Sequence, residues 1–293
     1  MKPPDFEYAR PSSVEEAVGV LAASGGDAKV LAGGQSLVPL LNFRLAAPSV
    51  LVDVNRVDTL AHLTLDGETL RIGATTRMRA LELDPMVRDL VPVLAAAARW
   101  VGHVQIRNRG TIGGSVAHAD PAAEVPAVCL LLDAELVALG PAGERRIPAD
   151  DFFAGFLTTT LAEDELLTEI RIPVRPAPHW GFREYAQRRG DFALAGAAAS
   201  GSLGPDGIVD AASLVVFGTA DRPVRCRTAE AELTGQPPTA DRLDRAAEAA
   251  ATEASADDPR PDAAYRRLVA RTMVRRALGD AFDNGAKGRE EVS

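Results

Sequence analysis

Two glycine pairs in similar small-residue segments constrain this chain more than any other feature. The segments are Ala32-Gly33-Gly34-Gln35-Ser36 and Thr111-Ile112-Gly113-Gly114-Ser115. Glycine lacks a Cβ, so it accepts a positive φ and lets a ligand approach consecutive backbone N–H groups, which together form an anion site. Neither segment contains Lys or Arg, so backbone dipoles and the hydroxyls of Ser36, Thr111 and Ser115 would hold the charge. The pattern favours a permanently bound diphosphate over a phosphoryl group in transfer.

The two segments do not match the commoner nucleotide-binding motifs. The chain contains no G-x-x-x-x-G-K-[ST], and no G-x-G-x-x-G follows a strand and opens a helix. A single Gly-Gly pair usually marks only a tight turn or a helix cap. Two similar pairs in one chain favour the ligand interpretation.

Charge and composition exclude several classes of function. A net charge of -9 argues against nucleic acid as a partner. No stretch of 18 apolar residues and no signal-peptide pattern occur, so we expect a cytoplasmic protein without membrane insertion. Two cysteines and four histidines lack ligand spacing, so we expect no metal or iron–sulfur cluster in this chain.

The first half of the sequence predicts mixed α/β structure. A helix over 14–23 and strands over 29–31 and 50–54 form a small unit that ends near residue 57. Asp66-Gly67 predicts the turn of a hairpin over 63–74. The apolar run 125–132 fits either a helix start or a buried strand. We further expect helices over 76–83 and 90–100 and strands over 133–139 and 165–173.

Three prolines between Pro173 and Pro178 mark the main domain boundary, because proline removes backbone donors and fixes φ. Beyond them we expect a small antiparallel sheet, then helices over 227–233, 243–253 and 263–278. The predicted units are subdomain 1 (1–57), subdomain 2 (58–176), a C-terminal α+β domain (177–284) and a disordered tail (285–293).

The chain resembles the FAD-binding, medium subunits of molybdenum hydroxylases, the group containing aerobic carbon monoxide dehydrogenase and bacterial xanthine dehydrogenase-like enzymes. The resemblance covers nearly the whole chain and rests on five segments in a specific order and spacing. They are Ala32–Leu37, Gln105–Ser115, Ala117–Glu124, Leu166–Pro173 and Arg189–Ala193.

The resemblance implies an α+β fold with a vanillyl-alcohol-oxidase-like (PCMH-type) FAD-binding domain. Two α/β subdomains would clasp FAD, the two glycine segments would converge on its diphosphate, and a C-terminal domain of a small sheet and helices would follow. The implied cofactor-binding residues are Ala32, Gly33, Gly34, Gln35, Ser36, Leu37, Thr111, Ile112, Gly113, Gly114, Ser115, Asp120, Glu124, Asp191 and Phe192.

Two acidic sites beyond the glycine segments carry roles that only the resemblance implies. Asp120 and Glu124 would direct carboxylates toward the ribityl chain or ribose, although Asp120 before Pro121 also fits a plain loop or helix cap. Asp191 and Phe192 would lie beside the isoalloxazine ring, although Phe192 also fits a core role.

The implied activity is electron transfer, with no catalytic side chain in this subunit. Electrons would pass from a large molybdopterin subunit through [2Fe–2S] clusters of a small subunit to FAD and then to an external acceptor, in a dimer of heterotrimers. A free-standing FAD-dependent oxidase or dehydrogenase, and a flavin-free assembly scaffold, are the alternatives. Valine at Gly33 or Gly113 should abolish FAD retention if these glycines have positive φ.

Overall fold

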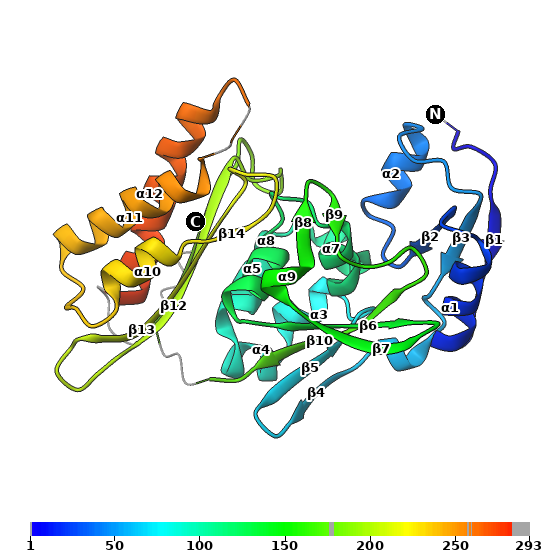
Figure 1. Cartoon of the computed structure of the whole chain (residues 1–293), viewed down its shortest axis with the longest axis horizontal. Coiled ribbons are helices and arrows are strands. Elements are labelled where there is room, and N and C mark those ends of the chain that lie inside the picture. The colour runs from blue at the N-terminus through cyan, green and yellow to red at the C-terminus, as the bar shows by residue number, and fades with distance from the viewer. Residues whose placement is uncertain (1, 176–178, 257, 259, 283–293) are drawn as a thin grey trace.

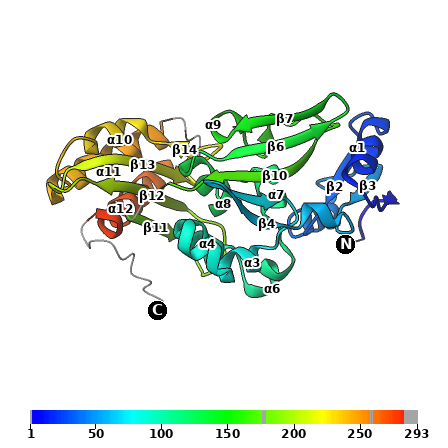
Figure 2. The same cartoon turned by 90° about the horizontal axis from the view of Figure 1, so that it is seen from below.

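The computed structural model describes residues 2–175, 179–256, 258 and 260–282. The chain forms three blocks in sequence order along its long axis, each built on its own sheet (Figure 1, Figure 2). We call them the N-terminal, central and C-terminal blocks. No helix in these residue ranges is long and apolar enough to cross a membrane.

The N-terminal block is a parallel three-stranded sheet with one helix against it. In sheet order the strands are β1 (Glu7–Ala9), β3 (Val50–Asp53) and β2 (Ala28–Leu31). The predicted helix 14–23 is confirmed as α1 (Val14–Ala23), which begins where the Ser13 hydroxyl accepts from the Glu16 N–H at 3.1 Å. A short helix, α2 (Leu37–Asn42), follows the first glycine segment and was not predicted.

The central block is an antiparallel sheet with most of its helices packed around the largest core. Its main strands, in sheet order, are β4 (Leu63–Asp66), β5 (Thr69–Gly73), β10 (Leu166–Pro173), β6 (Glu135–Gly140) and β7 (Gly143–Pro148). The helices are η1 (Asp58–Leu60), α3 (Met78–Leu83), α4 (Pro85–Leu90), α5 (Pro92–Trp100), α6 (Val104–Arg109), α7 (Ile112–His118), α8 (Glu124–Leu131) and α9 (Ala149–Phe152). A small hairpin adds β8 (Phe153–Gly155) and β9 (Thr158–Thr159).

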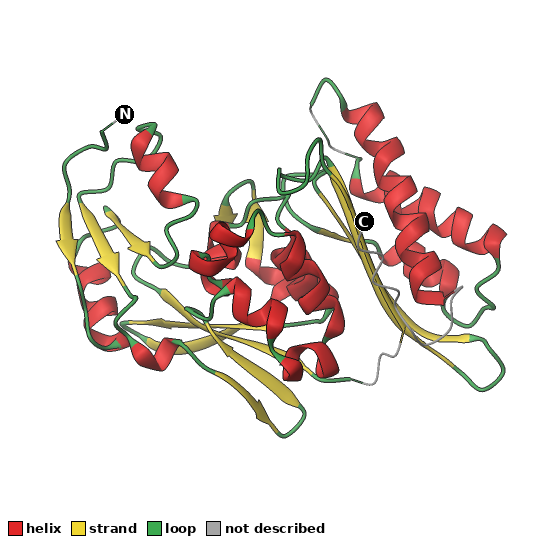
Figure 3. Ribbon diagram, turned by 180° about the vertical axis from the view of Figure 1, so that it is seen from behind, coloured by secondary structure: helices red, strands yellow, loops and turns green. Residues whose placement is uncertain are grey.

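The C-terminal block is a four-stranded antiparallel sheet between two helical layers. Its strands, in order, are β11 (His179–Tyr185), β12 (Ala195–Leu203), β13 (Val209–Phe217) and β14 (Val224–Arg225). Its helices are α10 (Arg227–Leu233), α11 (Ala240–Ala254) and α12 (Ala263–Phe282). Figure 3 shows these helices on the sheet face away from the central block. Helices α5 and α8 of the central block pack against the other face, which places α8 at the seam between the two blocks.

Most predicted elements are present, and the open assignment of 125–132 is resolved. The hairpin around Asp66-Gly67 is confirmed, and the apolar run is the fully buried helix α8. Strand β7 was missed because Glu144, Arg145 and Arg146 break the apolar alternation on an exposed sheet edge. The tail 285–293 lies outside the described residues.

Candidate functional site

The first glycine segment is an open loop between β2 and α2. Gly34 has φ +72°, in the left-handed region, and the Gln35 side-chain amide donates to the Gly33 carbonyl at 3.0 Å. Among the described residues, no acceptor pairs with the backbone N–H groups of residues 33–37. Polar backbone groups normally find partners, so this loop presents consecutive free donors suited to an anion.

The second glycine segment is different, because it is the first turn of helix α7. This helix was not predicted from the sequence. The Thr111 hydroxyl caps it, and each of the next four N–H groups has an internal acceptor. The acceptors for Ile112, Gly113, Gly114 and Ser115 are, in order, Thr76 O (3.0 Å), Ala74 O (2.9 Å), Thr111 Oγ1 (3.1 Å) and Thr111 O (3.1 Å).

Close packing, and not backbone conformation, explains Gly33 and Gly113. The expected positive φ at these two positions is wrong. A Cβ on Gly33 would lie 2.5 Å from the Arg109 carbonyl oxygen, and one on Gly113 would lie 2.5 Å from the Ala74 Cβ. The glycines therefore let the two segments pack side by side, and a Cβ on Gly114 would lie only 3.9 Å from the Ala32 Cβ.

Arg77, a cationic side chain near the two glycine segments, was not predicted as a site residue. Arg77 donates to the Asn55 side-chain oxygen at 2.7 Å and to the Arg109 carbonyl oxygen, and the Asn55 amide donates to the Ala32 carbonyl at 2.8 Å. Burial and the neighbouring Arg109 charge lower the pKa of Arg77. No ion pair with a carboxylate is found for Arg77 within the described part of the chain. Its position far from both glycine pairs in the sequence left no signal to find it.

The turn from Asp120 to Glu124 joins α7 to α8 at the seam with the C-terminal block. The Asp120 carboxylate accepts from the Ala122 N–H at 2.8 Å, so the plain loop role considered for Asp120 is present as an Asx turn, and the N-cap of α8 is Ala123. The Pro121 carbonyl accepts from the Gly218 N–H at 2.8 Å, which ties the turn to the end of β13. Glu124 opens α8 and is only 9% exposed, and this burial raises its pKa to about 7.

Asp191 and Phe192 lie on the connection between β11 and β12. Phe192 is 67% exposed, so the alternative core role is wrong. The loop rests against the central block, because a Cβ on Gly190 would lie 2.6 Å from the His103 ring. Among the described residues, no hydrogen bond joins this loop to either glycine segment.

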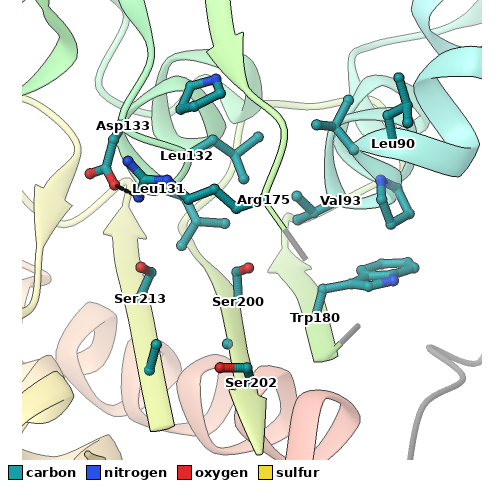
Figure 4. Close-up of a pocket in the computed structure, with 15 residues that line it drawn as sticks. Leu90, Val93, Leu131, Leu132, Asp133, Arg175, Trp180, Ser200, Ser202 and Ser213 are labelled. Carbon is teal, nitrogen blue, oxygen red and sulfur yellow. Dashed lines mark hydrogen bonds and ion pairs between the residues drawn. The ribbon is translucent and has the colours of Figure 1, made fainter. Parts of the chain in front are cut away.

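A separate cavity of about 130 Å³ opens at the same seam (Figure 4). Serines of the C-terminal sheet, including Ser200 and Ser213, form one wall, and the Arg175–Asp133 ion pair, with a nitrogen–oxygen distance of 2.7 Å, lies at its edge. None of its lining residues belongs to the predicted cofactor site.

Comparison with known families identifies the cofactor. Residues 4–175 match the family described as FAD binding domain in molybdopterin dehydrogenase, and residues 180–281 match the CO dehydrogenase flavoprotein C-terminal domain. The chain belongs to this flavoprotein family. It is an FAD-binding oxidoreductase subunit of the molybdenum hydroxylase type, as the resemblance implied.

The flavoprotein subunit is similar to its relatives over its whole length. It is 42% identical to 6-hydroxypseudooxynicotine dehydrogenase complex subunit alpha of Paenarthrobacter nicotinovorans, covering 100% of this chain and 99% of the relative. It is 39% identical to the carbon monoxide dehydrogenase medium chain of Hydrogenophaga pseudoflava, covering 96% and 99%.

Solved structures confirm the predicted fold class. A carbon monoxide dehydrogenase structure from Hydrogenophaga pseudoflava matches with a TM-score of 0.92 at 41% identity, covering 97% of this chain and 99% of that chain. Quinoline 2-oxidoreductase from Pseudomonas putida 86 matches with a TM-score of 0.91 at 36% identity, covering 98% and 100%.

The residues of the flavoprotein fit the chemistry of FAD. Free N–H groups at 33–37 and the Arg77 guanidinium suit a diphosphate. Carboxylates such as those of the Asp120–Glu124 turn are good acceptors for sugar and ribityl hydroxyls.

Proposed function

We propose that the first glycine loop, residues 32–37, holds the FAD diphosphate, with Arg77 supplying positive charge beside it. The observation that carries this assignment is the run of N–H groups at 33–37 for which the described residues offer no acceptor. The second segment, residues 111–115, packs against this loop, since a Cβ on Gly114 would lie 3.9 Å from the Ala32 Cβ. It also adds the Ser115 hydroxyl as a donor to the diphosphate.

The other predicted cofactor residues stay in the proposal with distinct roles. Glu124 accepts hydrogen bonds from the ribityl or ribose hydroxyls, and Asp120 shapes the turn that presents it. Asp191 and the exposed Phe192 ring contact the flavin from the C-terminal block. The division of the chain at residues 57 and 176 likewise remains our proposal.

The subunit works inside a complex with a large molybdopterin subunit and a small iron–sulfur subunit, arranged as a dimer of heterotrimers. Relatives named "medium chain" and "complex subunit alpha" support partner subunits. FAD, when bound, supplies the ability to take up electrons and deliver them to an external acceptor. The protein's own residues bind the cofactor, orient it and set the polarity around it.

Purification alone and with co-expressed partner subunits tests this function. We expect the purified chain to contain FAD, which denaturation of the protein would release and identify. We expect dehydrogenase activity only when the partner subunits are present. Activity of the isolated chain on a small molecule would instead establish a free-standing flavoenzyme, and a flavin-free chain under every condition would leave a scaffold.

A further inference from the structure

Two buried glutamates lie at the seam between the central and C-terminal blocks. Glu184 lies on β11, cross-strand from Gly196 of β12, which in turn pairs with Phe217 of β13. Alternate residues of a strand share a face, so Glu184 points to the same side as Phe182, which packs in the core of the central block. The Phe217 ring occupies the space above Gly196, where a Cβ would overlap the ring's Cζ atom. Glu124 approaches the same place from α8, whose preceding turn is bonded to Gly218 beside Phe217.

Among the residues that the structure describes, neither carboxyl group forms an ion pair with Lys, Arg or His. Both residues are 9% exposed, and no hydrogen-bond partner is found for the Glu184 Oε2 atom within the described ranges. The charges that act on Glu124 are those of Asp120, which raises its pKa, and Arg107, which lowers it. Arg107 is itself committed to Glu82, with a nitrogen–oxygen distance of 2.8 Å.

Two neighbouring carboxylates in a place that excludes water cannot both be ionised at low cost. One carboxylic acid beside one carboxylate is the favourable state, since the acid donates the hydrogen bond that the other accepts. These surroundings favour the protonated form of Glu184: burial, followed by the charge of Glu124, raises the pKa of Glu184 to about 9.

We propose that Glu184 is a positioning residue that shares one proton with Glu124 and thereby holds the Asp120–Glu124 turn in the shape that retains FAD. When the pair loses this proton to solvent at alkaline pH, the two carboxylates repel each other across the seam. The turn then loosens and FAD dissociates. Only this last step rests on the proposed function.

Other titratable groups nearby do not produce the same alkaline response. Burial lowers the pKa of His118, at the end of α7, so this imidazole is neutral throughout the alkaline range. Glu82 has a pKa below its usual value because Arg79 and Arg107 pair with it, and it stays ionised. On the opposite face of β11, Arg183 pairs with Asp280, with a nitrogen–oxygen distance of 2.5 Å.

FAD binding to the full-length chain, measured by flavin fluorescence between about pH 6.5 and 9.5, tests the proposal. We expect the wild-type dissociation constant to rise about fourfold, because pH 9.5 lies about half a unit above the pKa of about 9 at which the proton is lost. In Glu184→Gln the amide donates permanently to Glu124, so the dissociation constant should change less than about twofold. Glu68→Gln, at an exposed position, is the matched control and should keep the wild-type profile.

A second measurement keeps the proposal testable without the cofactor. Because the folded-state pKa of Glu184 lies above its unfolded value, its contribution to stability is complete below the unfolded value and declines as pH rises toward about 9. The thermal midpoint of the wild-type apoprotein should therefore fall between about pH 6 and 8.5, and the fall should be smaller in Glu184→Gln and in Glu124→Gln.

Each outcome has one meaning. A pH-independent wild-type dissociation constant, or a Glu184→Gln profile identical to the wild type, overturns the positioning role. No FAD binding at the lower pH counts against the proposed function instead, and the apoprotein midpoints then decide whether the shared proton exists. If Glu184→Gln does not fold, Glu124→Gln replaces it in the thermal measurement, which does not involve FAD.

Discussion

The two glycine segments have nearly the same residue types and opposite structural roles. In the first, residues 32–36, no acceptor in the described part of the chain pairs with the N–H groups from Gly33 onward, and Gly34 has a positive φ. In the second, residues 111–115, every N–H group from Ile112 to Ser115 is used internally, and helix α7 begins there. We propose the first segment as the FAD-binding loop, whereas the second is the close-packed start of helix α7.

The difference comes from what each segment packs against. The first follows a parallel strand, and side chains bond to its carbonyl groups: Gln35 donates to the Gly33 carbonyl and Asn55 to the Ala32 carbonyl. The second lies against Ala74, directly after strand β5, so two of its backbone N–H groups donate to the carbonyls of Ala74 and Thr76. A glycine pair thus indicates that another group lies close to the backbone. Whether that group is a ligand or the protein itself depends on the neighbouring element.

The largest effect should come from disrupting the close packing of Gly113 against Ala74. In Gly113→Val, the new Cβ would lie 2.5 Å from the Ala74 Cβ and 2.7 Å from its carbonyl oxygen. We expect a loss of about 3 kcal/mol of unfolding free energy, at the upper end for overpacking. FAD would be lost as a consequence. Urea denaturation measures this change.

The control for Gly113→Val is Gly19→Ala in α1, where a Cβ meets nothing within 4 Å. This substitution should stabilise the helix by about 0.5–1 kcal/mol. A folded Gly113→Val protein of wild-type stability would contradict the claim that Gly113 is required for packing against Ala74.

A smaller change in stability but a direct change in binding is expected in the open loop. Gly34→Ala puts a Cβ on a residue with φ +72°, at a cost of about 1 kcal/mol. Reorientation of the donors should weaken FAD binding about tenfold, equivalent to one lost hydrogen bond. Equilibrium dialysis with FAD provides the measurement.

The matched control for Gly34→Ala is Gly67→Ala, at φ +59° in the β4–β5 turn with open space around it. It carries the same backbone penalty away from the site. If both variants bind FAD equally well, the first loop is not the diphosphate site.

The smallest effect distinguishes the two hydroxyls. Thr111 accepts from the Gly114 N–H and caps α7, so Thr111→Ala should cost about 1 kcal/mol of stability. Ser36 makes no cap hydrogen bond at the start of α2, so Ser36→Ala should leave stability unchanged and reduce only FAD affinity. Thermal unfolding of both variants, with and without FAD, separates the roles; equal losses of stability would remove the distinction between the segments.

Local sequence patterns predicted many elements well, because their signals lie within a few residues. The helix over 227–233 was predicted with the same bounds that the structure shows, and the Asp66-Gly67 turn fixes its hairpin. Strand β1 and helix α7 were missed. Residues 7–9 are mostly exposed and gain their hydrogen bonds only from β3, and α7 contains two glycines that oppose helix propensity.

The candidate site was predicted in part. The resemblance pointed to both glycine segments, the Asp120–Glu124 turn and Asp191-Phe192 as separate stretches of chain. Arg77 and Glu184 carry no local motif, so their place at the site emerged only from the packing of α3 and β11 against distant elements.

The sequence by itself determined the family, the FAD cofactor and the positions where backbone must approach closely, because glycine spacing and turn residues act locally. The tertiary structure alone decided which glycine pair keeps free donors and which carboxyl groups are buried without a cation. Hydrogen-bond satisfaction and desolvation depend on partners far apart in the chain, such as Gly113 with Ala74 and Glu124 with Glu184. No local pattern encodes those pairings.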